Sequence, residues 1–161
     1  LRYFNPIGSH HSYLIGDSPL GKPENLMPNI LNAVNSDKTH LKIFGSDYDT
    51  FDGTPVRDFI HVEDLINGHV LALDFLKKSK KEIYEIFNIG IGKGLSVLQL
   101  VKSFEEVNDV KVSFKFAKKR KGDLPMYFSS AEKISKKLGW KPNLSFEDMC
   151  KSSWEFHKNN K

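Results

Sequence analysis

The sequence of 161 residues predicts an α/β fold on three observations. Strand-like and helix-like segments alternate along the chain, which is the pattern of α/β architecture. Serine stands at the N-cap position before three helical segments, at Ser96, Ser129 and Ser145. Hydrophobic residues make up 39% and charged residues 27%, a globular composition that provides enough apolar side chains for a core.

The N-terminal segment is predicted to contain a strand, a long loop and a helix. Leu1 to Asn5 predicts a strand that ends at Pro6, because proline has no N–H for a strand ladder. Residues 7–24 are rich in Gly, Ser, Pro and His and predict a long loop, which in a compact domain is usually functional. Asn25 to Val34 predicts a helix that has Pro28 in its first turn, where a missing N–H is tolerated.

The middle of the chain adds two strands and a helix. Leu41 to Gly45 predicts a short strand, and a polar loop over 46–55 leads to a second strand over Val56 to Val62. Glu63 to Lys78 follows as an amphipathic helix. Its apolar residues are expected together on one side, at Leu65, Ile66, Val70, Leu73 and Leu76.

Two further strands are predicted after this helix, over Ile83 to Ile89 and over Val110 to Phe116. Between them, Ser96 and Gln99 have the spacing of a capping box, in which each side chain accepts from the other's backbone N–H. This signal opens a helix that runs to about Val107.

The C-terminal region predicts two helices. Ser129 and Glu132 have the spacing of a second capping box, ahead of a short Lys-rich helix that stops at Gly139. Ser145 is expected to cap the last helix. The predicted elements therefore alternate from end to end, and the sequence contains no internal repeat.

Charge and cysteine content exclude several classes of protein. The net charge is only +4, and 21 of the 24 basic residues are Lys, whereas nucleic-acid binders tend to cluster Arg with aromatics. We therefore expect no nucleic-acid partner. No apolar run approaches the length of a membrane span, so no membrane association is expected. Cys150 is the single cysteine, which fits a reducing compartment and predicts a cytoplasmic protein.

Two further motifs are predicted to be structural. Gly90, Gly92 and Gly94 follow a strand, but their GxGxG spacing differs from the GxGxxG of dinucleotide sites, so a tight turn is expected. His10 and His11 have no third ligand near them in the sequence, so we expect no metal site. His61, at the end of a strand, is expected to make a structural hydrogen bond.

Two arginines are candidates for phosphate binding, because Arg occurs only three times in the chain. Arg57 and Arg120 both lie where a strand meets a loop. A guanidinium offers paired donors and a permanent charge, which suit phosphate. Asp123, close behind Arg120, has the chemistry to accept from a ribose or sugar hydroxyl. Surface ion pairs remain the alternative interpretation of both arginines.

Five segments together carry a resemblance to a known family. They are residues 2–8 (RYFNPIG), 25–28 (NLMP), 43–48 (IFGSDY), 52–62 (DGTPVRDFIHV) and 120–123 (RKGD). In order and spacing they resemble the UDP-glucose 4-epimerases, also called UDP-galactose 4-epimerases, of the extended short-chain dehydrogenase/reductases. The first segment fits many members of that superfamily, whereas the fourth is more specific to the epimerases. The chain departs from the family pattern at His11, where Pro is usual, and at Glu24, where Asn is common.

The resemblance implies that residues 1–161 are the C-terminal, UDP-sugar-binding portion of such an enzyme, with the last strands of its Rossmann sheet. The family inverts C4 of a UDP-hexose through a transient 4-keto sugar, with hydride passing to and from bound NAD and a tyrosine of a YxxxK pair as the base. This chain contains neither YxxxK nor the Gly-rich NAD loop. We therefore expect a fragment that lacks the N-terminal NAD-binding half and has no catalytic base. The intact enzyme would be a homodimer, as the family generally is.

The resemblance also assigns residues to a binding site. It places Phe4 and Pro6 beside the cofactor, Asn5 at the diphosphate of the UDP-sugar, and Tyr127 at the border of the hexose pocket. The remaining substrate-binding positions are expected to hold the nucleotide: Asn25, Leu26, Lys42, Ile43, Phe44, Arg57, Arg120 and Asp123. The resemblance implies no metal and no catalytic residue in this chain.

Two other functions remain open from the sequence. A related UDP-sugar dehydratase or decarboxylase shares several of the quoted motifs. A non-catalytic nucleotide-binding module, which never had an NAD half, would keep the same binding residues. The sequence upstream of Leu1 would distinguish the three functions.

Overall fold

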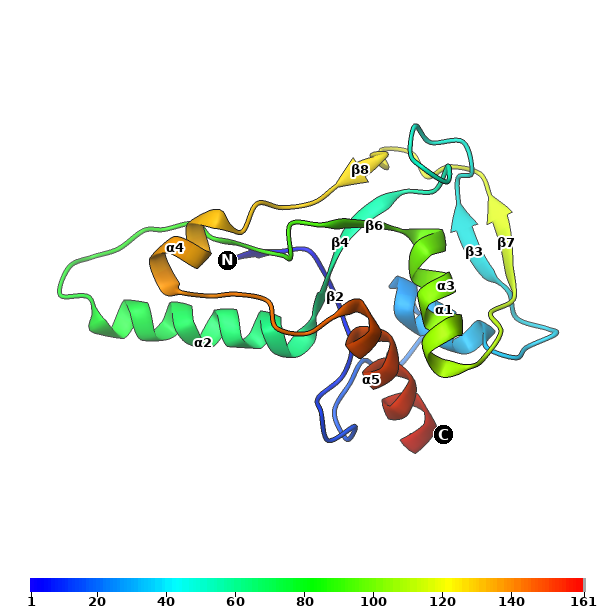
Figure 1. The fold of residues 1–161 in the computed structure, drawn as a ribbon, viewed down its shortest axis with the longest axis horizontal. Coiled ribbons are helices and arrows are strands. Elements are labelled where there is room, and N and C mark those ends of the chain that lie inside the picture. Colours follow the sequence, from blue (N-terminus) through cyan, green and yellow to red (C-terminus); the bar gives the residue numbers. More distant parts are fainter. Residues whose placement is uncertain (161) are drawn as a thin grey trace.

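A computed structural model describes residues 1–160 of the chain (Figure 1). Within that range the strands and helices alternate as an α/β fold does. Their order is β1 (Arg2–Tyr3), β2 (Asn5–Ile7), α1 (Leu26–Ala33), β3 (Leu41–Phe44), β4 (Val56–His61), α2 (Val62–Lys78), β5 (Asn88–Ile89), β6 (Gly94–Ser96), α3 (Val97–Asn108), β7 (Phe114–Ala117), β8 (Met126–Tyr127), α4 (Glu132–Leu138) and α5 (Phe146–Asn159).

Strand β4 is the centre of the largest sheet. Its second half pairs in parallel with β2, with Asn5 opposite Phe59. Its first half lies between β6, which is antiparallel, and β8, which is parallel and sets Arg57 opposite Tyr127. Two separate parallel pairs, β1 with β5 and β3 with β7, complete the described strands. The parallel pairing confirms the predicted α/β class.

Two hydrophobic clusters hold the chain together, one on each side of β4, where the neighbouring residues Phe59 and Ile60 belong to different clusters. The larger cluster joins α1, α3, α5 and β3 through fully buried side chains such as Ile30, Phe104 and Met149. The smaller joins α2, α4 and β5 around Ile89 and Trp140. Figure 1 shows the result, with α2 and α4 at one end of an elongated molecule and α1, α3, α5, β3 and β7 at the other.

The first strand continues beyond the residue at which it was predicted to end. Pro6 lies inside β2, which runs to Ile7. Among residues 1–160, β4 is the only strand that pairs with β2, so β2 is an edge strand. An edge position needs no donor on its outer side, which is where proline is accepted in sheets.

Two other predicted strands are shorter than expected. Of Ile83 to Ile89, only the last two residues pair, because their partner β1 is itself two residues long. Of Val110 to Phe116, the first half makes one isolated bridge, between Val112 and Val34, before β7 begins at Phe114. Apolar alternation predicted both segments, but the length of the available partner decided how much of each became a strand.

The serine caps predicted at the helix N-termini are confirmed at two helices and wrong at a third. The capping box at Ser96 and Gln99 is present, and Ser145 caps α5 in a box with Asp148. The predicted box at Ser129 is wrong, because α4 begins after Ala131, which provides no side-chain cap. The Ser129 hydroxyl is instead bonded to Asp58, 71 residues away in sequence.

Helix α2 has two apolar stripes rather than one. Leu65 is buried, and Leu71 and Phe75 on the same side pack against the smaller core cluster. Ile66, Val70, Leu73 and Leu76 are each 51–55% exposed. The prediction that all five residues lie together on one side is therefore wrong, because Leu65 is buried and the other four are exposed. Residues 66, 70 and 73 follow helical spacing as closely as 65, 68, 71 and 75 do, so the periodicity alone could not separate the stripes.

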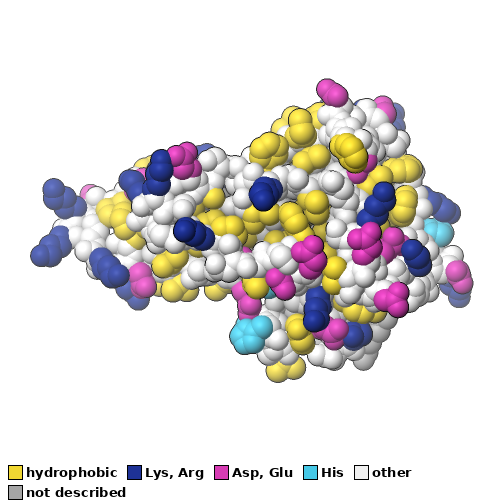
Figure 2. Space-filling view, in the orientation of Figure 1, with side chains coloured by type: hydrophobic (Ala, Val, Ile, Leu, Met, Phe, Trp, Pro, Cys, Tyr) yellow, Lys and Arg dark blue, Asp and Glu magenta, His cyan; other side chains and the backbone are white. Residues whose placement is uncertain are grey.

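The surface differs between the two ends of the molecule. Figure 2 shows hydrophobic side chains at the surface near β8, and Lys or Arg side chains around the far end of α2. The exposed apolar residues of the β8 region are Leu124, Met126, Tyr127 and Phe128. Within residues 1–160, no helix is both long enough and apolar enough to cross a membrane.

Candidate functional site

Arg57 is the centre of the candidate nucleotide site. Its guanidinium donates through Nη1 to the carbonyls of Val56 and Leu124, at 2.9 Å each. Nη2 lies 3.4 Å from Oδ1 of Asp123 in an ion pair. These contacts join β4 to the segment before β8, 66 residues further along the chain. The guanidinium is therefore held in one orientation, with its side chain 17% exposed.

Arg120 lies on the other side of Asp123. Its guanidinium carbon is 3.9 Å from the centre of the Phe44 ring, a cation–π contact. The N–H of Asp123 donates to the Arg120 carbonyl at 3.3 Å, in a turn that brings the two residues together. One aromatic ring, two arginines and one carboxylate thus contact one another in a series, which we call the contact chain: Phe44, Arg120, Asp123 and Arg57.

The contact chain also reaches the residues predicted near the hexose and the cofactor. Tyr127 is paired in register with Arg57. Its ring is 54% exposed and lies 5.1 Å, centre to centre, from the half-buried ring of Phe4. The structure therefore brings together six of the predicted residues, from β3, β4, β8, the loop before β8 and the link between β1 and β2: Phe4, Phe44, Arg57, Arg120, Asp123 and Tyr127.

The other predicted residues are placed differently. The side chain of Ile43 is 1% exposed and belongs to the core, so only its backbone is available to a ligand. Lys42 and Asn5 are exposed on strands β3 and β2. Asn25 and Leu26 lie at the start of α1, where the Asn25 side chain makes no cap hydrogen bond. Pro6 and Asn25 line a cavity that none of the six residues above lines.

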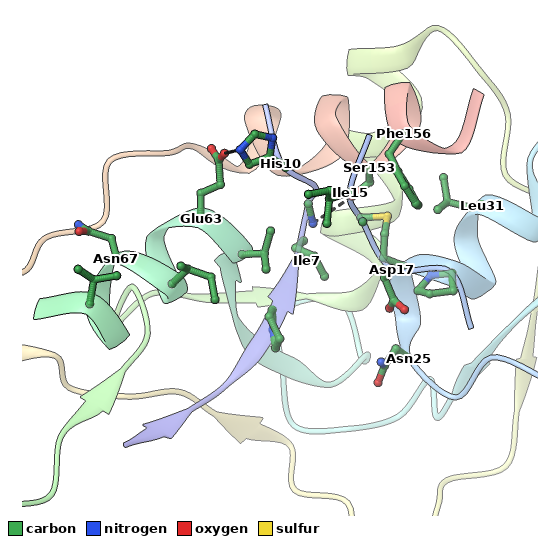
Figure 3. Close-up of a pocket in the computed structure, with 18 residues that line it drawn as sticks. Ile7, His10, Ile15, Asp17, Asn25, Leu31, Glu63, Asn67, Ser153 and Phe156 are labelled. Atoms are coloured by element: carbon green, nitrogen blue, oxygen red, sulfur yellow. Dashed lines mark hydrogen bonds and ion pairs between the residues drawn. The ribbon is translucent and has the colours of Figure 1, made fainter. Parts of the chain in front are cut away.

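That cavity has a volume of about 790 Å³ (Figure 3). Its walls come from β2, the loop that follows it, α1, α2 and α5. Most of the lining is apolar, including Ile7, Ile15, Leu31, Ile66, Val70 and Phe156. Polar side chains lie at its rim, among them Asn25 and Asp17 at one end and His10 and Glu63 at the other.

A buried carboxylate, Asp58, organises the loops behind the contact chain. Oδ1 accepts from the N–H of Ile91 at 2.9 Å, and Oδ2 accepts from the N–H of Gly92 and from both the N–H and the hydroxyl of Ser129. A Cβ on Gly90 would overlap Asp58 and Ser129, so glycine is required there. The Gly90–Gly94 segment is therefore a structural turn whose amides are used internally, as predicted.

Asp58 was not among the residues predicted for the site. The available signal was an acidic residue in the middle of an apolar strand, where burial requires compensating donors. Those donors come from residues 33 to 71 positions later in the chain, so no local spacing marks them.

His61 is buried and makes the structural hydrogen bonds expected of it. Its Nδ1 accepts from the N–H of Glu63 at 3.1 Å, which caps α2. Its Nε2 lies 3.1 Å from the hydroxyl of Ser152 on α5. With Nδ1 accepting, Nε2 carries the proton and donates to Ser152, so both ring nitrogens are satisfied.

His10 and His11, which have no third ligand near them in sequence, have one in space. Glu63, 52 residues later, lies with its Oε1 2.8 Å from Nδ1 of His11 and 3.8 Å from Nε2 of His10. Burial opposes ionisation of Glu63, but the hydrogen bonds from His11 outweigh it and lower the pKa of the carboxyl. The sequence offered no signal for this pairing, because it depends on how the loop after β2 folds over α2.

Comparison with known proteins identifies the family. The model of the NAD dependent epimerase/dehydratase family matches residues 1–90. The chain belongs to this family. UDP-glucose 4-epimerase 2 of Arabidopsis thaliana is 44% identical over 160 residues, covering 99% of this chain and 45% of that protein. UDP-glucose 4-epimerase of Bacillus subtilis is also 44% identical over 160 residues, covering 99% of this chain and 47% of that protein.

Solved structures of this epimerase/dehydratase family agree with the sequence comparison. A crystal structure of UDP-glucose 4-epimerase from Bifidobacterium longum in complex with NAD+ and UDP has a TM-score of 0.92 to this chain at 40% identity. The match covers 99% of this chain and 47% of that one. The chain thus spans about half the length of the relatives it matches, and the resemblance to UDP-glucose 4-epimerases is confirmed.

Proposed function

We propose that residues 1–161 form the UDP-sugar-binding portion of an epimerase that interconverts UDP-glucose and UDP-galactose at C4. One observation carries the proposal: the contact chain from Phe44 through Arg120, Asp123, Arg57 and Tyr127 to Phe4 gathers groups for every part of a UDP-sugar. The similarity of the whole chain to UDP-glucose 4-epimerases supports the same function.

The two arginines are proposed to hold the diphosphate. Nη1 of Arg57 is used by the Val56 and Leu124 carbonyls, so the pair with Asp123 at Nη2 is the bond that phosphate oxygens would compete for. Arg120 is exposed and its guanidinium lies over the Phe44 ring; it makes no hydrogen bond or ion pair with residues 1–160, which leaves its N–H groups available to an anion. Asp123, released from Arg57, would accept from a ribose hydroxyl.

The base and the sugar are assigned to the two ends of the contact chain. At one end, Lys42, Ile43 and Phe44 on β3 would read uracil through backbone groups and stacking, while Asn5, Asn25 and Leu26 support the nucleotide from β2 and α1. At the other end, the exposed ring of Tyr127 would border the hexose and limit its size. Exposure of 54% argues against the alternative that Tyr127 is a core aromatic.

The residues proposed to contact NAD fit a flat ring. Phe4 is half-buried and fixed against Tyr127, so one aromatic face is held beside the proposed sugar position. Pro6 follows it on the edge strand β2, whose side away from β4 is not paired with another described strand. When bound, NAD would supply hydride acceptance and return at C4. In this chain Phe4 and Pro6 would orient the cofactor and keep water from it.

The partners of the intact protein follow from the same proposal. We expect a homodimer, a second portion that carries the NAD loop and the YxxxK base, and no nucleic-acid or membrane partner. Cys150 is a free thiol and fully buried, which suits the reducing cytoplasm.

Calorimetric titration of the purified protein with UDP tests the proposal. Arg57→Ala is expected to weaken UDP binding at least about tenfold, because a hydrogen bond to a charged group contributes about 1.5–3 kcal/mol and each 1.4 kcal/mol is about tenfold in affinity. Arg57→Lys is expected to lose less, since a point charge remains but the paired donors do not.

The matched control is Arg2→Ala, at the third arginine of the chain, which is exposed on β1 outside the contact chain. It should bind UDP as the unchanged protein does. Equal UDP affinity in Arg57→Ala and Arg2→Ala would reject Arg57 as a phosphate ligand. Absence of UDP binding in the unchanged protein would reject the proposed function itself.

A further inference from the structure

Three metal-ligating side chains meet at the rim of the cavity. His10 and His11 come from the loop after β2, and Glu63 from the first turn of α2; Figure 3 labels His10 and Glu63. Their ligand atoms all lie within 4.8 Å of one another. His11 Nδ1 is 2.8 Å, and His10 Nε2 3.8 Å, from the same carboxylate oxygen of Glu63. None of the three belongs to the proposed nucleotide site.

The geometry of the loop holds both imidazoles in place. The N–H of His10 donates to the Ile15 carbonyl, and the N–H of Tyr13 donates back to the His10 carbonyl, which closes a tight turn. Tyr13 has a positive φ of 58° in this turn. The Ser12 N–H donates to Nδ1 of His10 at 3.2 Å, and the Ser12 hydroxyl lies 2.8 Å from the same nitrogen, so that ring is oriented with Nε2 toward Glu63. Contacts to the second ring nitrogen orient metal-bound histidines in the same way.

The Glu63 carboxylate is also positioned by its own segment. It accepts from the backbone N–H of His11 at 3.1 Å as well as from the His11 ring. The N–H of Glu63 is bound to Nδ1 of the buried His61, which fixes the residue at the start of α2. The loop and the helix are therefore already docked, and the three ligand atoms face one another before any ion enters.

We propose that His10, His11 and Glu63 bind one divalent transition-metal ion, such as zinc, at the rim of the cavity. Two imidazole nitrogens and one carboxylate oxygen are a preferred ligand set for zinc, and water completes the coordination. Tetrahedral ligands about 2.0–2.2 Å from an ion stand about 3.4 Å apart, so side-chain shifts of about 1 Å are needed to enclose it. The side chains have that freedom, since they are 41%, 77% and 30% exposed.

Binding replaces a hydrogen bond with coordination bonds. His11 loses to solvent the Nδ1 proton that it donates to Glu63 and takes one up at Nε2, so the ring stays neutral while the Nδ1 lone pair binds the ion. On His10, Nδ1 accepts from the Ser12 N–H, so Nε2 carries the ring proton. Binding through Nε2 moves that proton to Nδ1, where the Ser12 hydroxyl can accept it. The ion then cross-links the loop after β2 to α2, and so stiffens one wall of the cavity.

Zinc titration of the tag-free protein by calorimetry tests the site, with His11→Ala and Glu63→Gln as the variants. We expect one zinc ion per chain in the unchanged protein and at least tenfold weaker binding in each variant. The control is His40→Ala, a half-exposed histidine away from the loop, which should leave the affinity unchanged. Cobalt offers a second readout, because a visible absorption band should form in the unchanged protein and be lost in both variants.

Three results would overturn the proposal. They are the absence of zinc binding in the unchanged protein, equal affinity in the unchanged protein and His11→Ala, and an equal loss in His40→Ala, which would mean adventitious binding by surface histidines. Circular dichroism of each variant checks folding. If Glu63→Gln fails to fold, His11→Ala decides the question alone, because its side chain is 77% exposed and its truncation leaves no buried gap. UDP binding is independent of every one of these outcomes.

Discussion

At the residue scale, Asp58 shows how a side chain that touches no ligand can set the geometry of a site. It lies on β4 directly after Arg57 and is 0% exposed. Its two oxygens accept four hydrogen bonds, two from the Gly-rich turn and two from Ser129. Ser129 follows β8, so Asp58 fixes the strand on which Tyr127 lies. A buried charge is tolerated only because its acceptor capacity is filled in this way.

Asp58→Asn should therefore destabilise the protein. An amide group keeps one oxygen but turns an N–H donor toward either Ile91 or the Ser129 group, so at least one buried donor loses its acceptor. We expect the free energy of unfolding to fall by about 1–3 kcal/mol. Urea denaturation measures this change. The control is Asp74→Asn, an exposed residue of α2, which should change stability by less than about 0.5 kcal/mol. Equal effects of the two substitutions would show that Asp58 is not the organising group.

At the element scale, α4 is attached to the rest of the chain by charge as well as by its one fully buried side chain, Ile134. Lys133 and Lys137 stand one turn apart on this short helix, and both bind the carboxylate of Glu85, with Lys133 Nζ at 2.7 Å. The hydrogen bonds from Lys133 and then Lys137 lower the pKa of Glu85 to about 2. The segment between α2 and β5 is thereby tied to α4.

This ion cluster predicts a pH dependence with a definite sign. The folded pKa of Glu85 is about 2, below its ordinary value of 4.5, so the contribution of Glu85 to stability is complete above about pH 4.5 and is lost as the pH falls toward 2. Glu85→Gln should therefore destabilise the protein at pH 6 and have less effect at pH 3. NMR titration of the Glu85 carboxyl should give a midpoint near 2.

The control for this experiment is Glu82→Gln, an exposed residue of the same segment. Within residues 1–160, Glu82 takes part in no ion pair, so its substitution tests the loss of one surface charge without the cluster. A carboxyl midpoint of Glu85 near 4.5, or the same stability loss for Glu85→Gln and Glu82→Gln, would contradict the ion cluster.

The elements also show what could be predicted from the sequence. The box at Ser96 and the cap at Ser145 were predicted correctly because N-cap contacts are completed within four residues. The box at Ser129 had the same spacing and failed, since the N–H and hydroxyl of Ser129 both donate to Asp58, which lies far away in sequence, and α4 begins only after Ala131. The strand at 83–89 shrank to two residues for a similar reason, because its partner is distant and short.

For the candidate site, the sequence predicted individual residues but not the contacts between them. Arg57, Arg120 and Asp123 were found because Arg is rare in this chain and because the surrounding motifs resemble a known family. Their mutual contacts, by contrast, depend on the parallel pairing of β4 with β8, which no spacing within either segment reveals. The approach of Glu63 to His11 is of the same kind, with 52 residues between the partners.

At the scale of the whole molecule, β4 is the strand that joins the candidate site to the rest of the fold. It connects the two hydrophobic clusters, pairs with three other strands and holds Arg57, Asp58 and His61 along six residues. The groups proposed to bind the nucleotide depend on this one strand for their relative positions, and the chain that contains them spans about half the length of the relatives it matches. Binding and chemistry are therefore separable in principle.

That separation leads to a last prediction, that the 161-residue chain binds UDP but does not interconvert UDP-galactose and UDP-glucose. C4 oxidation needs a base positioned at the sugar hydroxyl, and none of the tyrosines in the chain has a lysine four residues later. The purified chain is incubated with UDP-galactose and NAD+, and UDP-glucose is assayed, with the UDP-glucose 4-epimerase of Bacillus subtilis as the positive control. UDP binding without turnover is the expected result. Turnover above buffer would place a catalytic base within these 161 residues, and would contradict the division of labour proposed for the chain.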